Sequence, residues 1–132
     1  MNKPIEAGLK ILFVVQLISS FLTGALGVFA PALIIGLSGL DLKATPAIQQ
    51  AGGLSLGFTL GALLALRATN WSEVRIFAIA SLVAFALSLI GAFYYIAIVG
   101  VVALGLIVIL LASLIMTVGL SYYGWKYMQA AA

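Results

Sequence analysis

The 132-residue sequence contains no cysteine, no histidine and only three acidic residues. Without cysteine there are no disulfides and no thiolate metal sites. Without histidine the commonest general base and the usual haem ligand are missing. The acids Glu6, Asp41 and Glu73 lie outside the long apolar runs, whereas pumps and many transporters keep an ionisable residue within the membrane. We therefore expect neither an enzyme nor a metal site.

Charge is scarce throughout the chain. Charged residues make up 7% and hydrophobic residues 65% of the sequence, with a mean hydropathy of +1.32, whereas a soluble domain carries about 25% charged and about 45–50% apolar residues. The composition predicts an integral membrane protein whose first partner is the lipid bilayer. The six cations form no basic patch, so nucleic acid is not an expected partner.

Hydropathy predicts an all-α fold, a single transmembrane domain over residues 1–132 with four spans. The expected spans cover roughly residues 9–30, 47–66, 74–93 and 99–121, and residues 31–46 form an outward loop. Part of this apolar loop should lie along the membrane interface or against the bundle, where a short helix is one possibility. Each span approaches or exceeds the about 20 residues that cross a bilayer. The uncharged run Ile76–Leu120 would measure about 68 Å as one helix at about 1.5 Å per residue, so we expect it to turn back between Gly91 and Gly100, near Tyr94 and Tyr95.

The distribution of cations predicts the orientation of an up-down-up-down bundle. Lys43 alone lies on the side of the outward loop; the other five lie on the side of the termini: Lys3, Lys10, Arg67, Arg75 and Lys126. Because short loops on the cytoplasmic side carry an excess of Lys and Arg, both termini should face inward.

The start of the chain resembles a signal peptide, with lysines before an apolar run. Pro31 directly follows Ala30, the one plausible cleavage position, so we expect the first span to be retained. The predicted location is a bacterial inner membrane, with several passes.

Small residues recur every fourth position in the second span, at Gly53, Gly57, Gly61 and Ala65. This glycine zipper would form one helix face without bulky side chains, where another backbone can approach closely. The first span has a matching face, with small residues at Ser20, Gly24 and Gly27. We expect these two faces to pack together.

Two glutamines and a set of surface residues complete the candidate sites. Gln16 and Gln49 should make hydrogen bonds between helices, because polar side chains in lipid need partners; for Gln16, a ligand-binding role remains the alternative. Trp and Tyr favour the membrane interface, flanked by cations. The expected interface anchors are Arg67, Trp71, Arg75, Tyr122, Tyr123, Trp125 and Lys126.

One stretch resembles a known group of proteins. It reads Gly52-Gly53-x3-Gly57-x3-Gly61, then Leu66-Arg67, with Trp71 and Arg75 at the next helix start. This layout is similar to small four-helix bacterial membrane proteins of the DoxX-like families, which are largely uncharacterised. Some of the wider group are linked to quinone-connected oxidoreductases, so the resemblance implies an accessory subunit and transfers no catalytic residue.

These features favour a non-catalytic accessory or assembly subunit of a larger membrane complex, respiratory or photosynthetic, which meets other subunits or further copies of itself. No cofactor is assigned, although lipid, quinone or pigment could contact the aromatic residues Phe58, Phe77, Phe85, Phe93, Tyr94 and Tyr95. The alternative is a small oligomeric transporter or channel for a neutral or small solute. It predicts a shared wet path lined by Gln16, Gln49, Ser55 and Thr59.

Overall fold

The computed structural model describes residues 3–100 and 102–129, and most of these residues are helical. The helices are α1 (Ala7–Phe29), α2 (Pro31–Ser38), α3 (Thr45–Arg67), α4 (Trp71–Tyr94) and α5 (Leu104–Gln129). A 3-10 turn, Leu42–Ala44, precedes α3, and a π-helical turn, Tyr95–Val99, follows α4. The described residues form no strand beyond one isolated bridge between Pro4 and Asn70. The predicted all-α class is confirmed.

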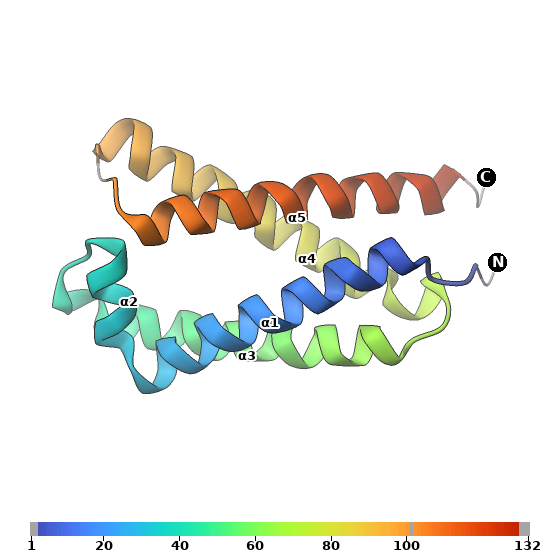
Figure 1. Cartoon of the computed structure of the whole chain (residues 1–132), viewed down its shortest axis with the longest axis horizontal. Helices are drawn as coiled ribbons and strands as arrows, with labels where there is room; N and C mark the ends of the chain where they lie inside the picture. Colours follow the sequence, from blue (N-terminus) through green and yellow to red (C-terminus); the bar gives the residue numbers. More distant parts are fainter. Residues whose placement is uncertain (1–2, 101, 130–132) are drawn as a thin grey trace.

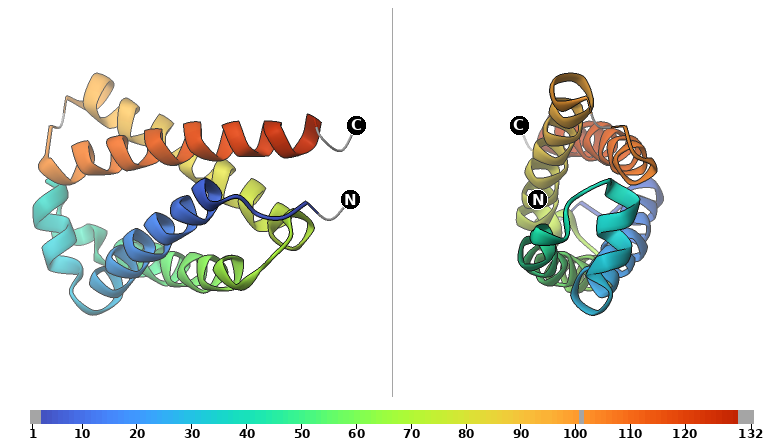
Figure 2. Two further views of the ribbon diagram at one scale, coloured as in Figure 1. Left: turned by 45° about the vertical axis from the view of Figure 1, so that its right-hand side comes forward. Right: turned by 90° about the vertical axis from the view of Figure 1, so that its left-hand side faces the viewer.

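The four long helices alternate in direction along the bundle. Figure 1 shows α1 and α3 side by side, α4 and α5 side by side, and both termini at the same end. The short helix α2 lies across the opposite end, where it contacts α1, α3 and α5. The end view in Figure 2 shows the four long helices arranged as a ring. This is the up-down-up-down bundle predicted from the spans.

Four helical segments have the length and composition of membrane spans. They are Ala7–Phe29, Leu42–Arg67, Trp71–Val99 and Leu104–Gln129, with mean hydropathies of 2.1, 1.2, 2.5 and 2.5. Each exceeds the about 20 residues that cross a hydrocarbon core. Large apolar side chains on their outer faces are open, as at Ile76 and Phe29. Such a surface suits lipid rather than water, and the chain is an integral membrane protein.

The helix boundaries differ from the predicted ones in three places. The outward loop contains the short helix that was considered for it, and residues 31–46 are helical over most of their length: Pro31 starts α2 and Gly39 ends it with a positive φ of 66°. The third span continues through the π-helical turn to Val99 instead of ending near residue 93, and the chain turns at Gly100, at the end of the range Gly91–Gly100 predicted for the turn; this glycine also has a positive φ of 75°. The last long helix, α5, continues to Gln129 instead of ending near residue 121. Residues 1–2, 101 and 130–132 of the predicted domain lie outside the described residues.

The N-terminal segment pairs with the turn between α3 and α4. The backbone N–H of Ile5 donates to the carbonyl of Thr69 at 3.0 Å, and the N–H of Trp71 donates to the carbonyl of Lys3 at 2.8 Å. These bonds satisfy backbone groups that would otherwise lie unpaired at the start of α4. The turn between α3 and α4 therefore fixes the position of the residues that lead into α1.

Tyr127, near the end of α5, locks this arrangement. Its hydroxyl donates to the carbonyl of Pro4 at 3.1 Å and accepts from the N–H of Glu6 at 2.8 Å. Its ring stacks on Trp71, with centroids 4.7 Å apart. Lys126 forms an ion pair with Glu6 at 2.8 Å, although half-exposed pairs contribute little. We call these contacts of residues 3–6, Thr69, Trp71, Lys126 and Tyr127 the terminal clasp.

Replacement of Tyr127 by phenylalanine tests the terminal clasp. Tyr127→Phe keeps the ring on Trp71 but leaves the N–H of Glu6 and the carbonyl of Pro4 without this partner. We expect the free energy of unfolding to fall by about 1–3 kcal/mol, the cost of leaving part-buried polar groups unpaired. Denaturant titration in mixed micelles measures it.

Tyr122→Phe is the matched control for the clasp. The ring of Tyr122 is exposed on the same helix, and its hydroxyl makes no hydrogen bond to another described residue. Its loss should leave stability unchanged. Equal stability of the two variants would contradict the role given to Tyr127.

Candidate functional site

The four long helices associate as two pairs. Contacts between α1 and α3 and between α4 and α5 are extensive, whereas contacts between the two pairs are few. A cavity of about 550 Å³, partly open to the outside of the bundle, lies between the pairs, and its volume is within the range of small-molecule sites. All five helices contribute to its lining, with residues that include Gln16, Ser20, Ser38, Ser55, Phe58, Phe85, Ser88, Ile109 and Ser113. We call it the interior cavity.

Glycines bring the backbones of α1 and α3 together beside this cavity. A Cβ placed on Gly27 would lie 2.9 Å from the Cα of Gly52, and one on Gly52 would lie 2.9 Å from the backbone nitrogen of Val28. Neither position has room for a side chain without moving a backbone. Gly24 faces Leu56 of α3 in the same contact.

The predicted face of α3 is therefore wrong at two positions. A Cβ on Gly53 or on Gly57 would meet no atom within 4 Å, so neither glycine packs inside the chain. Successive residues of a helix lie about 100° apart, and α3 turns Gly52 toward α1 instead. Ala65 is buried in the core, and Gly61 lies against the ring of Phe77 on α4.

Gln16 joins α1 to α4 beside the cavity. Its side chain is fully buried, and its Nε2 donates to the hydroxyl of Ser81 at 2.8 Å. Its Oε1 is also buried and has no hydrogen-bond partner among the described residues. Gln49 does not play the predicted role, because it lies exposed on α3 without a hydrogen bond to another described residue.

Ser20 joins α1 to α3 one turn further along. Its hydroxyl lies 2.6 Å from the carbonyl oxygen of Gln16, to which it donates, and 3.0 Å from the hydroxyl of Thr59. The Ser20–Thr59 contact fixes the rotation of α3, and this rotation is what turns Gly53 and Gly57 outward. Gln16 and Ser20 thus connect one helix to both of its neighbours.

The hydroxyls of the interior cavity fall into two groups. Several donate to carbonyls of their own helix, as Ser55 does to Ala51 and Ser88 to Ala84. Ser38 and Ser113 are buried, yet their hydroxyls make no hydrogen bond to another described residue. The lining residues include no charged side chain. Such a surface can bind a neutral molecule, and it offers no acid–base pair for chemistry.

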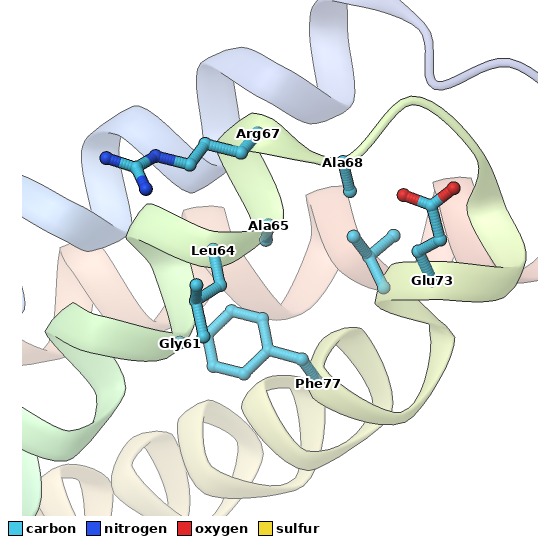
Figure 3. Close-up of a pocket in the computed structure, with 8 residues that line it drawn as sticks. Gly61, Leu64, Ala65, Arg67, Ala68, Glu73 and Phe77 are labelled. Carbon is cyan, nitrogen blue, oxygen red and sulfur yellow. The ribbon is translucent and has the colours of Figure 1, made fainter.

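A second hollow, about 500 Å³, lies beside the turn from α3 to α4. Figure 3 shows Glu73 on one side of it and Arg67 extending away from that carboxylate. Glu73 accepts from the N–H of Thr69 at 3.1 Å and from the amide of Asn70 at 3.0 Å. The acid stabilises the turn, and among the described residues it makes no ion pair with Arg67 or Arg75.

The predicted interface anchors divide between surface and interior. Tyr122 and Trp125 are exposed, and Arg67 and Arg75 are exposed beside the turn. Trp71 is buried in the terminal clasp, so its ring is not open to lipid headgroups as predicted. Tyr123 packs against Gly8 of α1, and Lys126 pairs with Glu6.

Sequence reasoning missed several residues of the site, among them Gly52, Ser38, Ser81 and Ser113. Ser81 and Ser88 stand seven residues apart in the uncharged part of α4 that follows Arg75, and this spacing places both on one face. A buried glutamine in lipid requires such a partner, so the pair of serines was a usable signal. Comparison with known proteins adds nothing further: no protein-family model, curated protein or solved structure matches the chain. The DoxX-like resemblance stays a prediction.

Alanine substitutions on α3 test which glycine faces α1. Gly52→Ala places a methyl group against the backbone of α1 and should lower the free energy of unfolding by about 1–3 kcal/mol through overpacking. Gly57→Ala places the same group in open space and should leave stability unchanged or raise it, because alanine favours the helix. Unfolding in mixed micelles measures both. The reverse order of the two effects would show that α3 is rotated as the sequence predicted.

Proposed function

We propose that the chain is a non-catalytic accessory or assembly subunit of a larger membrane protein complex, and that it docks through the outer face of α3. The observation that carries this proposal is the exposure of Gly53 and Gly57 within an apolar helix. Leu60 and Leu64 continue the same face toward the end of the helix, and both are exposed. We call these four residues the outer α3 face.

Energetics favour a partner at this face. Glycine within a helix is about 0.8–1 kcal/mol less favourable than alanine, and at Gly53 and Gly57 no contact within the chain offsets that cost. Close backbone approach is what glycine permits between helices in lipid. In the apolar 18-residue stretch of the span that contains α3, 11% is buried within the chain, against 17–28% in the corresponding stretches of the other three spans. A helix of another subunit would supply the missing contacts.

The type of complex follows from the resemblance alone. Some members of the wider DoxX-like group are linked to quinone-connected oxidoreductases, which favours a respiratory or photosynthetic complex. The interior cavity agrees with a non-catalytic role, because its lining offers hydroxyls and one carboxamide rather than charged groups.

Cross-linking from single cysteines tests the docking face, since the chain has no cysteine of its own. Gly57→Cys with a bifunctional maleimide in native membranes should yield a specific adduct with a different membrane protein, identified by mass spectrometry. Gly91→Cys is the control, because Gly91 on α4 is equally free of neighbours within 4 Å. An adduct pattern shared by both positions would contradict docking through α3.

Gly57→Leu completes the test by filling the face. The variant should unfold like the wild type, because no residue of the chain occupies that space, while it separates from the complex during gentle purification. Gly91→Leu should remain in the complex. A Gly57→Leu chain that stays assembled at wild-type levels would overturn the proposal.

A small transporter for a neutral solute is the second candidate, and the interior cavity favours it. This cavity lies within one chain, whereas the shared path between copies would need Gln49, which is exposed away from Gln16. If Gly57→Cys joins two copies of this chain and no other protein, the oligomeric transporter replaces the subunit as the better explanation.

The proposed location is a bacterial inner membrane, with the terminal clasp on the cytoplasmic side. The clasp end carries Lys3, Lys10, Arg67, Arg75 and Lys126, and the end with α2 carries Lys43 alone, the imbalance typical of the inside. A membrane-impermeant maleimide applied to intact spheroplasts should label Leu42→Cys but not Gln129→Cys, both of which are exposed. Lysis should expose the second position. The opposite pattern would reverse the orientation.

A further inference from the structure

We propose that the interior cavity binds one neutral amphiphile, a molecule with a hydrocarbon chain and an uncharged hydroxyl head, and that Gln16 receives the head. This inference is independent of the docking role of α3, because the cavity lies on the opposite side of that helix from Gly57. It rests on the charge of the lining, on unpaired buried polar atoms and on the shape of the space.

The lining excludes a charged ligand. None of its residues is ionic at neutral pH, and the cations of the chain lie at the ends of the helices. Transfer of an ion to an apolar interior without a paired charge is costly, and this cost persists at membrane depth. A phosphate or carboxylate head would find no counter-charge here, so the ligand must be neutral.

Gln16 has one hydrogen-bonding atom left over. Its amide nitrogen is bonded to Ser81, while its Oε1 is fully buried and unpartnered. A buried acceptor without a donor is a departure from the general rule that such groups are paired. A ligand hydroxyl would donate a hydrogen bond to this oxygen. The apolar walls and an ether cannot, because they have no donor.

Two further hydroxyls of the lining can still form a hydrogen bond with a ligand. Ser113 on α5 and Ser38 on α2 are 2% and 5% exposed, and neither hydroxyl bonds to another described residue. Ser20, in contrast, is already held by Gln16 and Thr59. The groups of Gln16, Ser38 and Ser113 thus come from α1, α2 and α5, and all three residues line the cavity.

The remainder of the lining is apolar and suits a hydrocarbon chain. Aromatic and aliphatic side chains from four helices form the walls, among them Ile34, Phe58, Phe85, Leu106 and Ile109. One water molecule occupies about 30 Å³ in the liquid. If each heavy atom of a ligand takes the same volume, a twelve-carbon alcohol needs about 400 Å³. The cavity of about 550 Å³ accommodates it.

Photolabelling of the full chain in phosphatidylcholine nanodiscs tests the proposal. The probe is 1-dodecanol with a diazirine in mid-chain, and the competitors are 1-dodecanol, dodecyl methyl ether and dodecyl phosphate at equal membrane mole fractions. We expect saturable labelling of lining residues, with dodecanol competing at least tenfold better than the ether and the phosphate not competing. Equal competition by all three, or labelling confined to lipid-facing residues, would overturn the proposal.

Two pairs of variants separate binding from folding. Gln16→Leu should abolish the preference for alcohol over ether, while Ser81→Ala, which breaks the same hydrogen bond between helices, should keep it. Ala112→Phe fills the cavity and should abolish labelling, while Leu111→Phe, at an exposed neighbour outside the lining, should not. Each variant is first shown to unfold like the wild type or to keep its helical circular dichroism.

The outcomes are decisive in both directions. Persistent alcohol preference in a folded Gln16→Leu chain would mean that another group receives the head. Persistent labelling in Ala112→Phe would place the probe on the outer surface. A cavity filled by water alone would give no saturable labelling in the wild type, and this too would overturn the proposal. Loss of the cross-link from Gly57→Cys would leave all of these measurements untouched.

Discussion

The close approach of α1 and α3 at Gly27 and Gly52 shapes the rest of the bundle. Because no side chain separates the backbones there, the two helices form a tight pair. The neighbouring polar contacts then act as spacers of defined length: Ser20 to Thr59 across the pair, and Gln16 to Ser81 toward α4. The backbones within the α1–α3 pair are close together, whereas the long side chain of Gln16 bridges this pair to α4. The space left between the two pairs is the interior cavity.

The two ends of the bundle are closed by different means. At one end α2 lies across the helix ends, and Gly105 of α5 approaches the backbone of Leu37. At the other end the terminal clasp joins the first residues to the α3–α4 turn and to α5. Between the clasp and the cavity, core side chains such as Phe13, Val74 and Met116 join the two pairs, and together with the ends they hold the pairs in register. The residues of the ends contribute to the site by position rather than by touching it.

Much of the architecture could be predicted from the sequence, because span number and direction depend on hydropathy, length and the positions of charges. The rotation of α3 could not. Gly53 starts the row of small residues in the sequence, whereas Gly52 is followed at the same spacing by Leu56 and Leu60. The contact that accompanies the observed rotation, between Ser20 and Thr59, joins residues 39 positions apart. Likewise Trp71 and Tyr127 have the composition of an interfacial belt, and only their stacking places them inside. Gln16 was recognised as needing a partner, but its unpaired oxygen is a property of the assembled helices.

The terminal clasp has a consequence for biogenesis. Tyr127 lies 121 positions after Glu6, so its contacts with the first residues form only after α5 has been synthesised, whereas the partners of Lys3 and Ile5 in the α3–α4 turn are made much earlier. The pair of α1 and α3 can assemble while the later helices are still being inserted, because segments that are synthesised first can fold first. The contacts of Tyr127 with Pro4 and Glu6 are therefore late ones, and they close the end of the bundle that lies away from α2.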